Sequence, residues 1–241
     1  MLETARVYNR SGRTSQVRVG LTGGLGSGKS TVGSMLREDG FQVLEADAIA
    51  RELMQPGQPV HRAIAEHFGP SVVRADGTLD RARLAAISFA EGRLQELTRI
   101  VHPPVIAEQE QRMAEIFARD PAAIVVIESA LIFEAEAAGT VPEWPGRFDR
   151  IVLVTAPEEM KVQRFLARIL PPGATEEQRA VAERDARRRI AAQLPDSVKI
   201  PHCHYVIDNS GSLEHTRRQV DRIAADLRAA VRGQPGAQGK V

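Results

Sequence analysis

The sequence of 241 residues has little of what marks a secreted or membrane-spanning protein. It holds one cysteine, Cys203, which has no partner for an internal disulfide, so we expect a reducing compartment and a cytoplasmic protein. No apolar run approaches the roughly 18 residues of a spanning helix. Residues 1–16 contain no apolar segment of the kind found in secretion signals, and we interpret them as a disordered leader.

An excess of charge of one sign is also absent, since 32 lysines and arginines face 31 aspartates and glutamates. This balance gives no reason to expect nucleic acid or an anionic membrane as a partner. The sequence also lacks the Asn-Lys-x-Asp motif with which a GTPase switch reads its base. With 43% hydrophobic and 26% charged residues, the composition is that of an ordinary chain long enough for one α/β core with insertions. We expect a monomer or a weak oligomer, although the sequence does not report the oligomeric state.

A glycine-rich segment lies between the first apolar run, residues 17–21, and a helical pattern at residues 30–39. Residues 23–30 fit G-x-x-x-x-G-K-[ST], in which glycines let backbone N–H groups converge on phosphate oxygens. The motif predicts that Lys29 reaches the outer phosphates of ATP and that Ser30 binds Mg²⁺ through its hydroxyl. The residues expected to hold the phosphates are Gly24, Gly26, Ser27, Gly28, Lys29, Ser30 and Thr31. A glycine-rich hairpin with an unrelated lysine is the alternative.

The second apolar run, residues 41–47, ends in the acids Glu45 and Asp47. Because the carboxyl ends of parallel strands face the ligand crevice, we expect both acids near the phosphate loop, on one side of the strand. A carboxylate there can accept the proton of an attacking hydroxyl or bind Mg²⁺ through water. Capping of the next helix is the other interpretation of each acid.

The most apolar strand, residues 122–128, ends at Glu128, and Glu134 follows six residues later. An acid that closes a buried parallel strand is a suitable second carboxylate for hydrated Mg²⁺, so we predict that Glu128 binds the metal through water. Glu134 is explained equally well as an acid at a helix start or in a loop.

Residues 48–121 have the apolar spacing of helices and no clear strand, which predicts a helical insertion over one side of the crevice. We expect His102-Pro103-Pro104 to break this block before a long helix over residues 105–118. His102 stays open, as a residue that contacts substrate or as a capping or packed histidine.

Two further helical patterns, residues 157–169 and 175–194, flank a break at Leu170-Pro171-Pro172-Gly173-Ala174 that suits a hinge. A mobile helical segment with arginines beside a phosphate loop is typical of a lid that excludes water and brings positive charge to a transferred phosphoryl group. We expect Arg164, Arg168 and Arg189 to act there, with Arg164 as a catalytic residue. A solvated charged helix face is the alternative for each arginine.

The last predicted strand, residues 205–208, leads into Asn209-Ser210-Gly211, and we expect the backbone at Asn209 and Gly211 to meet the nucleotide base. His202-Cys203-His204 has the residue types of a metal site but no fourth partner at a suitable spacing. The predicted division is a leader at 1–16, a nucleotide-binding core at 17–47, 122–160 and 200–227, a helical substrate region at 48–121, a lid at 161–199 and a tail at 228–241.

The ordered motifs from Val17 to about Leu227 resemble the dephospho-coenzyme A kinase family. Because unrelated nucleotide-binding proteins share the phosphate loop, the resemblance depends on the motifs that follow it. These are Glu45-Ala46-Asp47 with Ile49-Ala50-Arg51, Phe68-Gly69, Asp76-Gly77-Thr78-Leu79, His102-Pro103, Leu131-Ile132-Phe133-Glu134, Arg189 to Gln193, and Val206-Ile207-Asp208-Asn209-Ser210-Gly211. Three places depart from the family pattern: Glu45 replaces an aspartate, Ala130 replaces a proline, and residues 170–175 lack an Arg-Asp pair.

The resemblance implies a P-loop NTPase-type three-layer α/β sandwich with a parallel sheet, a helical substrate-binding insertion and a helical lid. It implies that ATP phosphorylates the ribose 3′-hydroxyl of dephospho-coenzyme A, the last step of coenzyme A synthesis, with Asp47 as the base and Pro171-Pro172 in the lid. The alternative is a P-loop kinase of another small nucleotide or nucleoside. An inactive ATP-binding regulator is disfavoured because Lys29, Ser30 and Asp47 are all retained.

Overall fold

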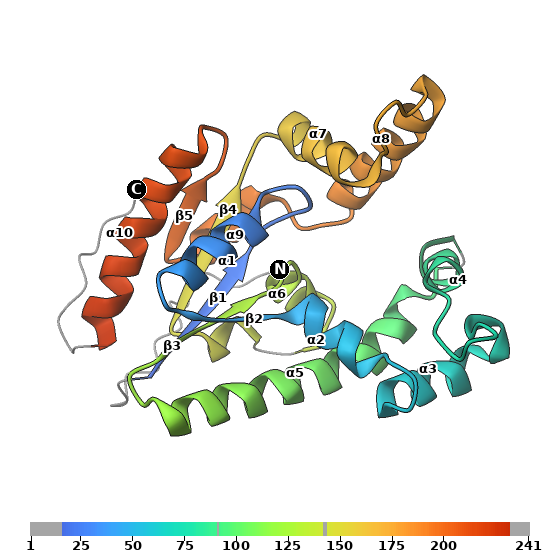
Figure 1. The fold of residues 1–241 in the computed structure, drawn as a ribbon, viewed down its shortest axis with the longest axis horizontal. Helices are drawn as coiled ribbons and strands as arrows, with labels where there is room; N and C mark the ends of the chain where they lie inside the picture. The colour runs from blue at the N-terminus through green and yellow to red at the C-terminus, as the bar shows by residue number, and fades with distance from the viewer. Residues whose placement is uncertain (1–15, 91, 142–143, 232–241) are drawn as a thin grey trace.

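A five-stranded parallel sheet in the order β2-β3-β1-β4-β5 forms the centre of the computed structural model, which describes residues 16–90, 92–141 and 144–231 (Figure 1). The strands are β1 Val17–Thr22, β2 Gln42–Glu45, β3 Ile124–Glu128, β4 Arg150–Thr155 and β5 Tyr205–Asp208. Each neighbouring pair is parallel, so the carboxyl ends of all five strands meet at one edge. The predicted α/β class with a parallel sheet is confirmed.

Helices cover both faces of this sheet. α1 Lys29–Glu38 and α10 Leu213–Val231 pack on one face, and α5 Leu94–Arg119 and α6 Ile132–Ala137 pack on the other. Because side chains alternate along a strand, Val126 joins the first apolar cluster and its neighbours Val125 and Ile127 join the second. β3 is buried along its whole length, as a central parallel strand must be when both of its faces are covered.

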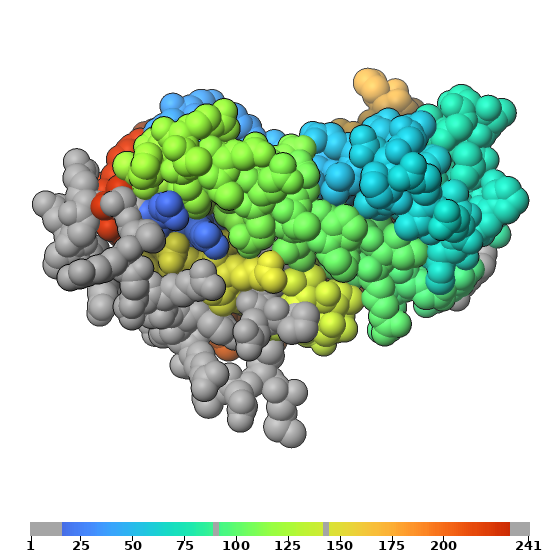
Figure 2. Space-filling model, turned by 90° about the horizontal axis from the view of Figure 1, so that it is seen from below, coloured from blue at the N-terminus to red at the C-terminus, as the bar shows by residue number. Residues whose placement is uncertain are grey.

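The block after β2 builds a smaller apolar cluster of its own, at one end of the molecule (Figure 2). Its elements are α2 Ala46–Leu53, α3 Pro59–Phe68, the 3₁₀ turn η1 Pro70–Val72, α4 Arg81–Ala85, the π-helical turn η2 Ala86–Ala90 and the first turns of α5. The cluster consists of Val60, Ile64, Phe68, Val72, Leu79, Leu84 and Ile87. Ala46 and Ile49 of α2 pack with Val105 of α5, which connects the block to the sheet layer.

The expected helix break at His102-Pro103-Pro104 is wrong, because α5 continues from Leu94 to Arg119 with both prolines inside it. A proline inside a helix removes a hydrogen bond and costs about 3 kcal/mol. Tertiary packing holds the helix on each side of the prolines, through Ile100 in the smaller cluster and through Ile106 in the sheet core. This packing outweighs the tendency of the two prolines to break the helix.

Beyond β4, two helices that pack against each other project from the sheet, α7 Glu158–Ile169 and α8 Glu176–Ala191 (Figure 1). Thr175 starts α8 with a capping box, in which its hydroxyl and the Gln178 side chain exchange hydrogen bonds with each other's backbone N–H groups. The remaining elements are the 3₁₀ turn η3 Trp144–Arg147, the short helix α9 Asp196–Lys199 and the 3₁₀ turn η4 Ile200–His202.

The predicted tail begins too early, since α10 runs to Val231 and residues 228–231 are therefore helical. Residues 1–15 of the expected leader and residues 232–241 of the expected tail lie outside the described part of the chain. Over the described ranges, no helix has the length and apolar character that crossing a membrane requires.

Candidate active site

Residues 23–28 connect the carboxyl end of β1 to α1, at the sheet edge where all five strands finish. Gly28 is the N-cap of α1, so the positive end of the helix points at the loop. The N–H of Ser27 donates to the carbonyl oxygen of Gly24 at 3.1 Å and closes the turn. The strand, glycine turn and helix that the phosphate motif requires are therefore present.

Two glycines of the loop leave no room for a side chain. A Cβ at Gly26 would lie 2.2 Å from the carbonyl oxygen of Lys161, and a Cβ at Gly28 would lie 2.0 Å from the side-chain nitrogen of Asn209. Both residues also have positive φ, 71° and 95°. Neighbouring groups and backbone conformation thus independently demand glycine at these positions.

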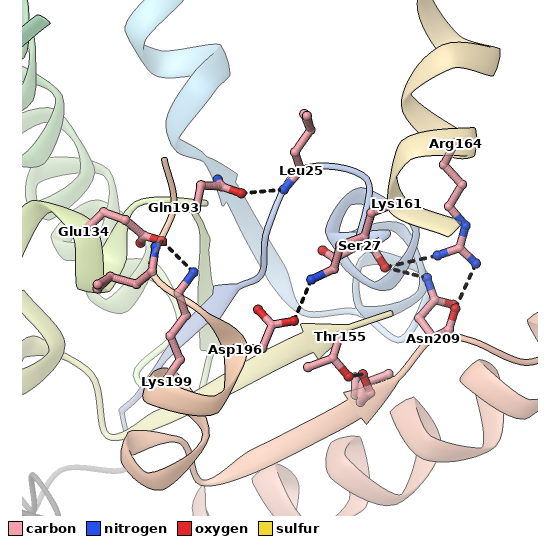
Figure 3. A network of polar contacts seen from close by, with 12 residues as sticks. Leu25, Ser27, Glu134, Thr155, Lys161, Arg164, Gln193, Asp196, Lys199 and Asn209 are labelled. Carbon is pink, nitrogen blue, oxygen red and sulfur yellow. Dashed lines mark hydrogen bonds and ion pairs between the residues drawn. The ribbon is translucent and has the colours of Figure 1, made fainter. Parts of the chain in front are cut away.

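Asn209, directly after β5, fixes the shape of the loop from the other end of the chain. Its buried side-chain nitrogen donates to the carbonyl oxygen of Ser27 at 2.8 Å, and its Oδ1 accepts a bond from the Thr216 hydroxyl at 2.7 Å. The Arg164 guanidinium donates to the carbonyl oxygens of Ser27 and Asn209 at 3.4 and 2.8 Å (Figure 3). These contacts favour loop positioning for both side chains, while base contact at Asn209 and catalysis by Arg164 stay predictions.

Ser30 and Glu128, which we predicted to bind the metal, are in contact with each other. The Ser30 hydroxyl donates to Oε1 of Glu128 at 2.8 Å. Gly33 of α1 makes space for this carboxylate, because a Cβ there would lie 2.7 Å from its other oxygen. Burial raises the pKa of Glu128 despite the Ser30 hydrogen bond and the nearby charge of Lys29, and the charges of Glu45 and Asp47 raise it further. A cation bound beside Glu128 would favour the charged form of this buried carboxyl group.

Lys29 is the first residue of α1 and lies among charges from several elements. Burial lowers its pKa, and the charges of Glu128 and then Asp47 act in the opposite direction. Lys199 and Arg168 lower the pKa of Lys29 by a smaller amount. Because such interactions weaken with distance, Glu128 and Asp47 lie close enough to Lys29 for their charges to act on it.

Asp47 lies on a helix and not on a strand. β2 ends at Glu45, and Asp47 lies exposed in the first turn of α2, where the helix dipole favours an acid. The expectation that Glu45 and Asp47 share one side of a strand is therefore wrong. Glu45 accepts a hydrogen bond from Arg37 of α1 at 2.8 Å. Asp47 makes no ion pair within the described residues, so its carboxylate is available to a ligand.

The segment 193–199, called the strap below, follows α8 and includes α9. Gln193 Oε1 accepts a bond from the N–H of Leu25 in the phosphate loop at 2.9 Å. Lys161 of α7 pairs with Asp196 at 2.6 Å, and the fully buried Lys199 pairs with Glu134 at 2.5 Å (Figure 3). Sequence reasoning assigned none of these roles. The Arg-x-x-x-Gln spacing at 189–193 was a signal for Gln193, whereas nothing in the sequence marks Lys199 as buried.

The other predicted residues lie around this centre. Arg168 of α7 and Arg189 of α8 both stack near the ring of Phe165, at 5.6 and 5.7 Å from its centroid. Gly24 lies beside the strap, since a Cβ there would be 3.0 Å from the Gln193 oxygen. Thr31 is an exposed residue in the first turn of α1, and Gly211 lies against His215 at the start of α10.

His102 and the His202-Cys203-His204 run, which the sequence left open as possible ligand contacts, make hydrogen bonds within the protein. Nδ1 of His102 lies 3.3 Å from the Thr140 hydroxyl oxygen, and burial lowers the pKa of this histidine. In the His202-Cys203-His204 run, His204 accepts a bond from the N–H of Ile151 and the Cys203 thiol donates to the carbonyl of Lys199. Burial raises the pKa of Cys203 to about 12, so it is a packed thiol and not a reactive one.

The arrangement is suited to phosphoryl transfer. A loop of converging N–H groups and a lysine can hold a triphosphate, and a hydroxyl–carboxylate pair beside it can hold a hydrated cation. An acid on a separate helix, close enough for its charge to act on Lys29, can receive a proton from an attacking hydroxyl. Catalysis in such a site depends on positioning and on stabilising the charge of the transferred group.

Comparison with known proteins agrees with this chemistry. The family model described as dephospho-CoA kinase matches residues 17–215. The dephospho-CoA kinase of Corynebacterium efficiens is 38% identical over 212 residues, which cover 88% of this chain and 97% of that protein. The dephospho-CoA kinase of Syntrophotalea carbinolica is 40% identical over 223 residues, with coverage of 92% and 97%.

Solved structures show the same architecture. The crystal structure of TT1252 from Thermus thermophilus superposes with a TM-score of 0.67 at 32% identity and covers 88% of this chain and 98% of its own. The dephospho-CoA kinase from Campylobacter jejuni superposes with a TM-score of 0.55 over 88% of this chain and 98% of its own. At 17% identity, the second likeness concerns the fold alone.

Proposed function

The chain belongs to the dephospho-CoA kinase family, and on that premise we propose how its residues transfer the γ-phosphoryl group of ATP to the ribose 3′-hydroxyl of dephospho-CoA, giving ADP and CoA. The observation that supports this assignment most is the Ser30–Glu128 hydrogen bond beside Lys29, on which the charges of both Glu128 and Asp47 act. It combines a phosphate cradle, a metal position and a base.

The phosphate loop holds ATP through backbone N–H groups of residues 24–31, with Lys29 as a point charge on the outer phosphates. Because Asn209 and Arg164 fix the carbonyl of Ser27, the loop keeps its shape before the nucleotide arrives. A preorganised cradle stabilises the transition state without a cost of reorganisation at the moment of reaction.

The residues at the metal position fit Mg²⁺, which prefers oxygen ligands and keeps several of its waters. The Ser30 hydroxyl would hold the ion directly, and Glu128 would hold it through water. The raised pKa of Glu128 agrees with this role, since a cation would compensate its buried charge. Bound there, Mg²⁺ would neutralise charge on the phosphate oxygens.

Asp47 orients the 3′-hydroxyl of the acceptor and receives its proton as the oxygen attacks the γ-phosphorus. Asp47 is exposed in the first turn of α2, directly before residues 48–121, the helical block that we assign to dephospho-CoA binding. The α7–α8 pair acts as the lid, with Arg168 and Arg189 directed by their stacking on Phe165.

A kinetic comparison of two neighbouring acids tests this assignment. The wild-type chain, D47N and E45Q are assayed for ATP-dependent conversion of dephospho-CoA, with nucleoside monophosphates as alternative acceptors. D47N should lower kcat by about 10²- to 10⁴-fold and leave the KM for ATP nearly unchanged. E45Q should have a much smaller effect because Glu45 is paired with Arg37. Near wild-type turnover of D47N would remove Asp47 as the base, and preference for a monophosphate would reassign the acceptor.

A further inference from the structure

A hollow of about 250 Å³ lies between the carboxyl-terminal part of α2 and the segment 74–84. Three arginines line it, Arg51 of α2 and Arg74 and Arg81 of the segment. Apolar side chains of Met54, Leu79 and Leu84 form the other part of its wall. The hollow therefore combines a concentrated positive charge with an apolar surface, in a volume that suits part of a small molecule.

The positive charge of the hollow is only partly compensated by the protein. All three arginines are exposed, and neither Arg51 nor Arg81 has an ion pair within the part of the chain that the structure describes. Arg74 lies 3.5 Å from Asp80, whose carboxylate also caps α4 by accepting the N–H of Arg83. Three guanidinium groups around one cavity suit an anion with several oxygens, since each guanidinium can donate two parallel hydrogen bonds.

The segment that carries Arg74 and Arg81 is held in a defined shape. The N–H of Arg74 donates to the carbonyl of Thr78 at 2.8 Å, and Thr78 donates twice to the Asp76 carboxylate. Nε2 of the buried His61 lies 2.8 Å from the carbonyl oxygen of Gly77. A turn fixed in this way presents its arginines at a lower conformational cost than a flexible loop would.

The hollow continues the face of α2 that carries Asp47. Arg51 follows Asp47 by four residues, so the two side chains lie on one face, about 6 Å apart along the axis. The opposite face of α2 is buried through Ile49, which packs on Val105 of α5. A ligand that reaches Asp47 and extends along the exposed face of α2 meets Arg51 next and the hollow after it.

We propose that this hollow binds the 5′-diphosphate of the acceptor nucleotide through Arg51, Arg74 and Arg81, and the start of its pantetheine arm through Met54, Leu79 and Leu84. The inference rests on the proposed function. The 3′-hydroxyl and the 5′-carbon of a nucleotide are attached to adjacent ring positions, so one helical turn of α2 matches the step from the hydroxyl at Asp47 to the diphosphate at Arg51. The enzyme would therefore recognise its acceptor partly through the diphosphate bound in this hollow.

The test is a set of KM values for wild type, the double variant R74A/R81A and the control R62A. Arg62 is an exposed arginine on α3 that does not line the hollow. The double variant should raise the KM for dephospho-CoA by about tenfold for each guanidinium removed. Its KM for ATP and its kcat at saturating acceptor should stay close to wild type, as should both constants of R62A. The paired lysine variant R74K/R81K should recover part of the affinity, because it keeps the charge.

The possible outcomes separate this inference from the function on which it rests. If wild type converts dephospho-CoA and R74A/R81A has an unchanged KM for it, the diphosphate pocket is wrong and the kinase assignment stands. A parallel loss of ATP affinity and of the thermal unfolding midpoint, without recovery in the lysine variant, would indicate a structural role and also overturn the inference. If wild type does not phosphorylate dephospho-CoA, both proposals fall.

Discussion

The phosphate loop and the neighbouring α7–α8 pair are held in place by different means. The loop is fixed by glycines that have no free space, by a hydrogen bond that Asn209 donates to it and by one that Gln193 accepts from it. α8 buries little more than Ala182 and Ala186 against α7, and exposed ion pairs supply many of its other contacts. The phosphate loop, which must keep its geometry, is thus fixed by close packing and hydrogen bonds. The proposed lid is held mainly by exposed ion pairs, which water can replace.

On the basis of this contrast, we expect the largest loss of activity when a single methyl group is added to the phosphate loop. G28A would place a Cβ 2.0 Å from the Asn209 side chain and force alanine to φ 95°. Because a shift of about 1 Å in a catalytic group can cost 10²-fold, we expect kcat/KM to fall by at least about that factor.

Gly173, between the two lid helices, provides the matched control for this change. It also has positive φ, 80°, but no atom lies within 4 Å of its missing Cβ. G173A should therefore lose some stability through backbone strain and keep most of its activity. Equal losses of activity in G28A and G173A would contradict the view that the loop is fixed by its neighbours.

A second prediction concerns the buried acid of the site, Glu128. Its folded-state pKa is raised, mainly by burial, so the folded protein holds the proton to higher pH than the unfolded chain does. Stability therefore falls as pH rises from the ordinary carboxyl pKa through the raised value. E128Q removes this loss, so without nucleotide and metal it should be more stable relative to wild type at pH 7 than at pH 4.

Activity should change in the opposite direction to stability in E128Q. The amide cannot provide the negative charge for a hydrated cation, and we expect roughly a 10- to 100-fold loss of turnover at a fixed Mg²⁺ concentration. Thermal unfolding at the two pH values and steady-state kinetics check the pair of effects. A variant that is destabilised to the same extent at both pH values would show that the charge of Glu128 is not costly.

The parts of the site that depend on local chain chemistry were predictable from the sequence. The phosphate loop, the strand before it and the acid that closes β3 all follow from residue types at short spacing. Asp47 was singled out as an acid near the loop, and its charge acts on Lys29, but its strand assignment was wrong because the helix starts at Ala46. A four-residue strand followed directly by a helix has too little alternation to mark its end.

Contacts between distant segments were not predictable in the same way. Gln193 and Leu25 are 168 residues apart, and Asn209 and Ser27 are 182 residues apart. The continuity of α5 through two prolines also depends on clusters at both ends of the helix, which no local pattern displays. Sequence reasoning thus identified the groups that do chemistry more readily than those that hold them.

The third prediction compares two glutamines that accept the same kind of hydrogen bond, one at the phosphate loop and one in the α7–α8 pair. Gln193 Oε1 accepts the N–H of Leu25 in the phosphate loop, and Gln178 Oε1 accepts the N–H of Thr175 at the start of α8, both at 2.9 Å. Q193A leaves a loop N–H without this partner and should raise the KM for ATP by about five- to tenfold.

Q178A is the control, because it loses an equivalent bond in a capping box away from the loop. It should lower the thermal unfolding midpoint slightly and leave the KM for ATP unchanged. If the two variants changed the KM for ATP alike, the strap would have no special connection to nucleotide binding.

The smallest effect is expected at Arg187, which joins α8 to α7 through Glu158 and Glu159 and also pairs with Glu183 of its own helix. These pairs are exposed and screened by water and salt, so R187A should shift the thermal unfolding midpoint by less than about 2 °C. The shift should shrink further at high salt, because wild type then loses the same interactions. R188A, which removes a pair with Asp185 within α8, controls for the loss of a helix charge. A large, salt-independent loss in R187A alone would mean that α8 is held as firmly as the phosphate loop, and the contrast between the two regions would fail.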